Sequence, residues 1–113
     1  MSNRTPKLLL EDILTCSQKI LFYTKELTYE QFLADDKTID AVIRNFEIIG
    51  EASNRLTEEF RDKHLSVEWH RIRGFRNRIV HDYMGIDYKI LWNIKENFLP
   101  LLIEQVKLIN EKI

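Results

Sequence analysis

The sequence predicts an all-α domain, an up-and-down bundle of about four main helices plus short helices. Glycine and proline, which interrupt helices, occur only three times and twice in 113 residues. Apolar residues recur at three- and four-residue steps over long stretches, whereas the strict alternation of a strand is absent. The length suits one compact domain, which we expect to span residues 1–113.

The first helix is expected over about 6–27. Thr5 is a typical N-cap residue, and Pro6 suits the first helical turn, where a missing N–H costs nothing. The segment TYEQ at 28–31 matches a capping box, in which the threonine and glutamine side chains each accept from the other residue's backbone N–H. We therefore expect a short second helix through Leu33.

A third helix is expected from a cap at Asp35 or Asp36 to about Leu56. Its apolar residues cover a broad arc, which favours more than one packing partner. Gly50 lies inside this helix, where glycine is less stable than alanine. Its presence therefore indicates that another helix approaches closely at that point.

The stretch 57–66 reads as a connector with at most a short helical turn. Ser66 is expected to cap the next main helix, over about 67–82, and Gly85 to end it.

Asp87 is expected to cap a last helix over about 88–112, which Pro100 should kink. Its apolar residues form two stripes. One contains Leu91, Ile94, Phe98, Leu101, Leu102, Leu108 and Ile109, and the other contains Trp92, Leu99, Ile103, Val106 and Ile113. The pattern leaves open whether the second stripe meets another subunit or is buried within the monomer.

Composition excludes several classes of protein. The net charge of -1 indicates neither a nucleic-acid nor a membrane partner for the chain as a whole. Cys16 is the single cysteine, so no internal disulfide can form, which is typical of a reducing compartment. No apolar run reaches the roughly 18–20 residues that a membrane span requires. We expect a cytoplasmic protein that needs no cofactor.

The stretch FRNRIVHDY, at 75–83, stands out because a charged residue interrupts its apolar pattern. On a helical wheel Arg76 falls inside the apolar arc, and a guanidinium there needs a carboxylate, carbonyl groups or a wet cleft. Glu47 and Glu51 could pair with it, although a solvated role suits them better. His81 lies about 140° from Arg76 around the helix. A straight helix therefore does not point the two side chains the same way.

These residue types fit cleavage of RNA by its own 2′-hydroxyl. A neutral His81 can take the hydroxyl proton, and Arg76 can bind the phosphate oxygens in a bidentate manner. Asn77 can orient either group, and Tyr83 can bond the phosphate or stack on a base. No metal is needed, and the three histidines, His64 included, lack the spacing of a metal site. A salt bridge and a helix cap remain an alternative role for the same residues.

The basic character of the chain is local. Residues 61–81 hold six Arg or Lys side chains against two acids, a balance of +4. His70, Arg73 and Arg78 belong to this region and are the candidates for further contacts with RNA.

GFRNRIVHDYMGID, at 74–87, closely resembles the signature of the HepT-like toxins of the HEPN superfamily. Their motif is Arg, four residues, His, one residue and Tyr. AVIRNFEIIGEASNRL, at 41–56, resembles the corresponding third-helix segment of that family, and the resemblance covers essentially the whole chain.

The resemblance implies a HEPN-like helical bundle that forms a homodimer, with the two motifs facing across a shared cleft. It implies a metal-independent endoribonuclease acting on RNA, such as transfer or messenger RNA, with Arg76 and His81 as the catalytic pair and Asn77 in support. It also implies the toxin of a type II toxin–antitoxin system. The partner would be a nucleotidyltransferase antitoxin of the MNT type, which neutralises the toxin by binding it or by AMPylation of Tyr83.

Two other functions remain open at this point. The chain could be a non-catalytic HEPN subunit that binds a nucleotidyltransferase or a nucleotide and cuts nothing. It could also be a structural dimerisation bundle, in which an apolar replacement of Arg76 would be harmless or stabilising.

Overall fold

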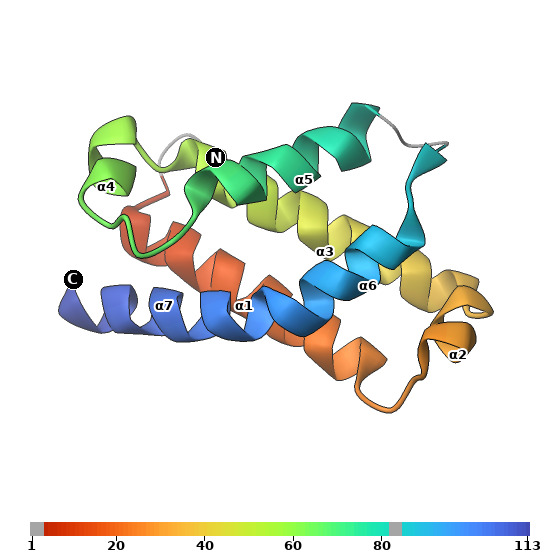
Figure 1. Cartoon of the computed structure of the whole chain (residues 1–113). Coiled ribbons are helices and arrows are strands. Elements are labelled where there is room, and N and C mark those ends of the chain that lie inside the picture. The colour runs from red at the N-terminus through yellow and green to blue at the C-terminus, as the bar shows by residue number, and fades with distance from the viewer. Residues whose placement is uncertain (1–3, 82–84) are drawn as a thin grey trace.

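The computed structural model describes residues 4–81 and 85–113, with only the backbone of Val80 and His81. These residues form seven helices and no strand (Figure 1). The helices are α1 (Pro6–Thr24), α2 (Tyr29–Leu33), α3 (Asp36–Arg55), α4 (Glu58–Asp62), α5 (Trp69–His81), α6 (Tyr88–Asn97) and α7 (Leu99–Lys112). The predicted all-α class is confirmed.

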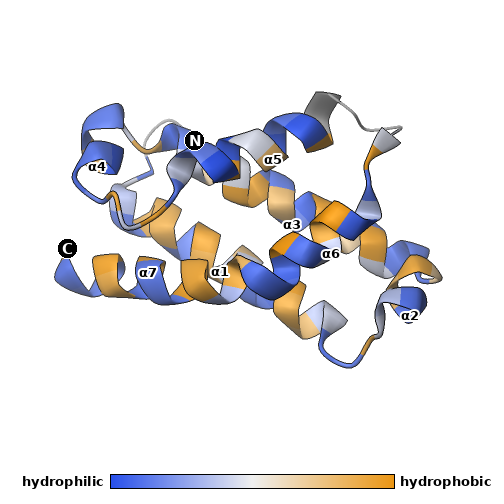
Figure 2. Ribbon diagram, viewed as in Figure 1, coloured by the Kyte–Doolittle hydropathy of each residue, from blue (hydrophilic) through white to orange (hydrophobic). Residues whose placement is uncertain are grey.

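A single core of buried apolar side chains holds the long helices together. Helix α1 packs between α3 and α7, and α5 packs along α3, while α2 and α4 lie at opposite ends of the bundle (Figure 1). Apolar residues of the long helices α1, α3, α5 and α7 form the core, whereas α4 is mostly hydrophilic (Figure 2). The fully buried positions include Leu10, Ile13, Phe46, Ile49, Ile72 and Leu102. No helix in the described ranges is both long and apolar enough to cross a membrane.

Capping side chains begin the first three helices where the sequence indicates. The Thr5 hydroxyl accepts from the N–H of Leu8, and the capping box of α2 is complete. Asp35 is the N-cap of α3, and its hydrogen bonds from Thr38 lower the pKa of the Asp35 carboxyl. The first helix ends at Thr24 and so is three residues shorter than the periodicity suggests.

The expected cap at Ser66 is wrong, because α5 begins at Trp69. The chain before it is held in turns around one carbonyl group. The carbonyl oxygen of His64 accepts from the N–H of Val67 at 3.4 Å and from the indole N–H of Trp69 at 3.0 Å. These bonds delay the start of the helix. The expected end of the helix at Gly85 is not tested, because residues 82–84 lie outside the described ranges.

The prediction of a single last helix is also wrong in part, because the chain forms two helices, α6 and α7, that meet at Phe98. Pro100 lies in the first turn of α7, where it cannot donate a backbone hydrogen bond and so favours a helix start over continuation. Asp87 caps α6 as expected, through the N–H of Lys89.

The break changes which apolar stripe is buried. Leu99, Ile103 and Val106 lie in the interior, whereas Leu101 and Leu108 are 53% and 58% exposed. The two stripes read from the sequence therefore mix buried and exposed residues. A subunit contact on the exposed residues stays a prediction.

The end of α3 depends on a side chain from α4. The Arg61 guanidinium donates to the carbonyl oxygen of Ser53 at 3.0 Å and also to that of Leu56. These are carbonyl groups of the last helical turn, which have no partner within the helix. Arg61 thus ties the connector to the helix that carries Gly50.

We expect Arg61→Ala to lower the free energy of unfolding by about 2 kcal/mol, because it leaves these carbonyl groups without a charged donor. Urea unfolding measures the change. Lys63→Ala is the matched control, since its ion pair with Glu59 is exposed and should contribute about 0.5 kcal/mol or less. Equal losses in the two variants would contradict the capping role.

Candidate functional site

Helix α5 carries most of the residues that the sequence singles out. His70, Arg73, Asn77 and Arg78 are exposed on it, whereas Arg76 is half-buried. His81 is the last residue of the helix, and Tyr83 lies outside the described residues. The structure thus places the predicted arginine and histidine on one helix, about 7.5 Å apart along its axis.

The half-buried position of Arg76 results from a close crossing of α3 and α5. A methyl group added at Gly50 would overlap the Cβ and Cγ atoms of Arg76. Only glycine leaves room for the arginine stem at this point of α3. The close approach expected at Gly50 is therefore confirmed, and its partner is the arginine of the motif.

The crossing holds the stem of Arg76 and leaves part of its guanidinium group without a partner among the described residues. Its Nε atom is buried and has no hydrogen-bond partner in residues 4–81 and 85–113. Among residues 4–81 and 85–113 no ion pair joins Arg76 to Glu47 or Glu51. In this part of the chain the possible pairing with these acids is therefore not formed, which agrees with the solvated role that the sequence favours for them. A guanidinium held in this way suits an anionic ligand, which would supply the missing acceptors.

Positive charge lies on both flanks of α5, and Arg61 and Arg73 supply it on the side of α4. Burial and the nearby charge of Arg73 lower the pKa of Arg61. At the side of α5 that faces α6, Arg71 pairs with Glu68 at 3.2 Å on the exposed surface. The local excess of cations found in the sequence is therefore divided between the two flanks of α5, with Arg61 and Arg73 on the α4 side and Arg71 and Arg78 on the α6 side.

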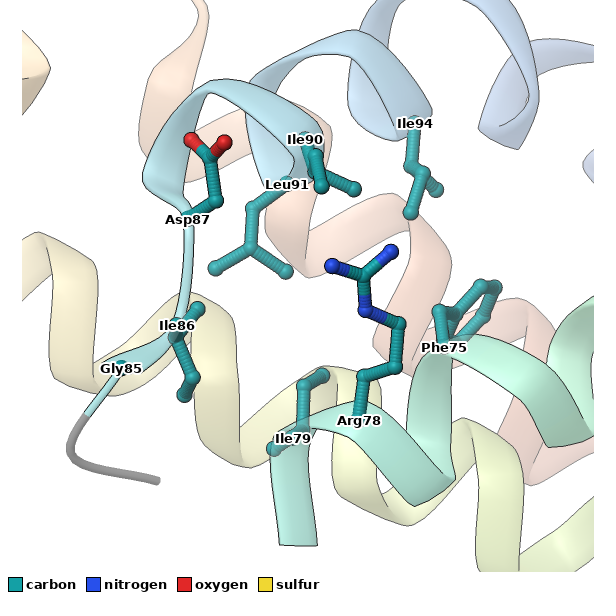
Figure 3. Close-up of a pocket in the computed structure, with 9 residues that line it drawn as sticks. All are labelled: Phe75, Arg78, Ile79, Gly85, Ile86, Asp87, Ile90, Leu91 and Ile94. Carbon is teal, nitrogen blue, oxygen red and sulfur yellow. The ribbon is translucent and has the colours of Figure 1, made fainter. Parts of the chain in front are cut away.

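A shallow groove between α5 and α6 was not anticipated from the sequence. Figure 3 shows its end near α6, where the Arg78 side chain extends from α5 toward Ile90 and Ile94. Phe75 and Leu91 form apolar walls. The apolar periodicity of the two helices does not predict this groove, because it forms only where residues of α5 and α6 lie side by side.

The described residues form neither a reactive cysteine site nor a metal site. Cys16 is buried, and burial raises the pKa of its thiol, so the reactive thiolate is disfavoured. In the part of the chain that the structure describes, no three His, Cys, Asp or Glu side chains lie where they could hold a metal ion. Metal independence stays a prediction.

Comparison with known proteins gives a family. The family described as Ribonuclease HepT-like matches residues 13–109. The Methanocaldococcus jannaschii protein named "Putative RNase MJ1380" is 38% identical over 109 residues, which are 96% of this chain and 100% of that protein. The Thermococcus cleftensis protein named "Probable ribonuclease HepT" is 38% identical over 99 residues, 88% of this chain and 90% of that protein. No solved structure gives a significant match.

We expect Gly50→Ala to lower the free energy of unfolding by about 1–3 kcal/mol, although alanine is the better helix former. The added methyl group would overlap the stem of Arg76 and push α5 away from α3. Thermal or urea unfolding measures the change. Asn54→Ala, at an exposed position of the same helix, is the control and should be neutral or slightly stabilising. Wild-type stability in Gly50→Ala would show that the crossing is not tight.

Proposed function

Because the chain belongs to the HepT-like ribonuclease family, we propose that it is a toxin that cleaves RNA internally and without a metal ion. One observation carries this proposal. Arg76 is fixed over Gly50 with a buried Nε atom that no described group satisfies, on the helix that ends at His81. A structural arginine would be expected to have a carboxylate or carbonyl partner.

The proposed reaction is an attack within the RNA strand. His81 takes the proton from a ribose 2′-hydroxyl, and the 2′-oxygen forms a bond to the adjacent phosphorus. The bond from phosphorus to the 5′-oxygen of the next nucleotide breaks, and that oxygen gains a proton. The products are a 2′,3′-cyclic phosphate and a 5′-hydroxyl. Arg76 stabilises the negative charge that builds on the phosphate oxygens, and Asn77 supports it.

The proposed site is built from two copies of the chain. Arg76 and His81 are about 140° apart around α5, so one copy does not direct both side chains at one phosphate. A two-fold dimer would place Arg76 of one copy opposite His81 of the other. His70, Arg73 and Arg78 are exposed on the same helix and would bind neighbouring phosphates.

The proposed regulation acts on Tyr83. A nucleotidyltransferase antitoxin of the MNT type would bind the toxin and transfer AMP from ATP. The tyrosine oxygen would attack the α-phosphorus, pyrophosphate would leave, and the phenol would lose its proton. AMP on Tyr83 would add bulk and negative charge next to the motif, where it would repel an RNA phosphate.

We expect wild-type protein to cleave total and transfer RNA with EDTA present. Arg76→Ala and His81→Ala should lose at least about 100-fold in rate, because each removes a group that acts on the reacting atoms. Lys107→Ala, which removes an exposed cation of α7, is the matched control and should cleave like wild type. Fragment analysis measures the rates after folding and oligomeric state have been checked.

Two results would count against the ribonuclease proposal. No cleavage by wild type with an unmodified intact mass would favour a binding subunit that cuts nothing. Equal cleavage by wild type and both site variants would place the activity elsewhere.

We expect the antitoxin with ATP to add AMP to wild type and not to Tyr83→Phe, while modified wild type loses cleavage. Intact-mass and fragment mass spectrometry locate the added group. Tyr88→Phe is the control, because it removes the next tyrosine along the chain and should still be modified. Modification at another residue, or full cleavage after modification of Tyr83, would contradict this role.

A further inference from the structure

Gly74 lies in the middle of α5, and nothing in the described residues accounts for it. It is exposed, and a methyl group added there would meet no described atom of another segment within 4 Å. Glycine is the weakest helix former after proline. Gly50 has a neighbour that requires the missing side chain, whereas Gly74 opens on empty space. A notch of this kind suits something outside the chain that approaches the backbone closely.

The notch at Gly74 opens onto the groove between α5 and α6. Around it, aromatic rings of Phe75 and Phe98 line the groove, together with Arg71 and Arg78. Asn93 and Asn97 line the opposite side, from α6. The groove continues past Arg78 to the start of α6 (Figure 3).

The groups in this groove match the parts of a nucleotide. The exposed Arg71 guanidinium lies over the buried Phe98 ring, 4.7 Å from its centroid, so the ring supports a flat cation on which a base can stack. The Asn97 side chain donates to the Asn93 side-chain oxygen. This bond leaves the Asn93 amino group and the Asn97 carbonyl oxygen able to bond a base edge. Arg78 can bind a phosphate.

We propose that this groove binds one base of a single-stranded RNA segment, beside the phosphate that is cleaved. The inference rests on the proposed ribonuclease function and adds a second contact site to it. Gly74 and His81 are two helical turns apart on one face of α5, about 10 Å along the axis. A strand attacked at His81 therefore reaches the notch with a nearby nucleotide.

Charge favours RNA over a second copy of the chain as the occupant. At Gly74 the groove is lined by two arginines and two asparagines and by no described carboxylate. Glu68 pairs with Arg71 at 3.2 Å, and Asp87 lines the continuation of the groove near the start of α6, so the cationic excess lies at the Gly74 end. A two-fold contact through this surface would bring its arginines together, which is unfavourable. A polyanion with exposed bases meets both the charge and the stacking surface.

The test is binding of an unstructured 2′-O-methyl oligonucleotide, whose blocked hydroxyl prevents cleavage. We expect Gly74→Leu and Asn93→Ala to weaken binding about tenfold or more. Gly74→Ala should raise Tm by about 4 °C, because nothing opposes the added methyl group, and yet weaken binding. Gln18→Leu places the same side chain on an exposed position of α1 and should bind like wild type. We therefore expect Gly74→Ala to be more stable than wild type and to bind the oligonucleotide more weakly.

The same variants separate this inference from the ribonuclease proposal. Wild-type binding and cleavage in Gly74→Leu and Asn93→Ala would overturn the groove and leave the ribonuclease proposal standing. Loss of binding in these variants, with no cleavage by any protein, would support the groove and overturn the ribonuclease. A change from dimer to monomer in Gly74→Leu without RNA would assign the groove to a second copy and overturn RNA as its occupant. Absence of oligonucleotide binding by wild type would overturn it as well.

Discussion

The close crossing of α3 and α5, where Arg76 lies on the backbone of Gly50, is the contact on which the candidate site depends. It sets the distance between the two helices and fixes the stem of an arginine that has no carboxylate partner in the described chain. Two features that lower stability meet at this point: a glycine inside a helix, and a buried nitrogen atom that no described group satisfies. The glycine makes room for the stem of Arg76, and an anion would supply the acceptor that the nitrogen atom lacks.

Contacts at the end of α3 and at the start of α5 fix the two helices that cross. Arg61 satisfies the last carbonyl groups of α3, and the turn around His64 fixes the start of α5 at Trp69. On the other side, α6 ends at Phe98, whose side chain lines the groove in which Gly74 lies. Helix α5 therefore presents a fixed arginine toward α3 and an open notch toward α6. The two features lie on nearly opposite sides of α5, because Gly74 and Arg76 are two positions, or about 200°, apart around the helix.

Local signals could be predicted from the sequence, because they depend on residues close along the chain. The caps at Thr28, Asp35 and Asp87 require partners two or three residues away, and all three are formed. Contacts between distant segments could not be predicted in the same way. The sequence indicated that another helix approaches Gly50 and that Arg76 is a charged residue inside an apolar arc. Only the way in which α3 and α5 cross shows that the two features are partners.

The groove was missed for a related reason. Gly74 lies two residues before Arg76 and entered the sequence analysis only as part of the resemblance, since no periodic pattern distinguishes an unfilled glycine from a packed one. Asn93 and Asn97 carry no signal in the sequence, because their role depends on α6 lying beside α5. The turn that delays α5 was missed as well, because it depends on a bond from the Trp69 indole and not on the Ser66 side chain.

Mixing Arg76→Ala protein with His81→Ala protein tests most directly whether two copies build one site. Each variant alone should be inactive. If Arg76 of one copy acts with His81 of the other, the mixed dimer regains one complete site, and statistical mixing should restore about a quarter of wild-type cleavage. If the mixture stays inactive although mixed dimers are shown to form, the pair does not act across two copies, and this account of the site is wrong.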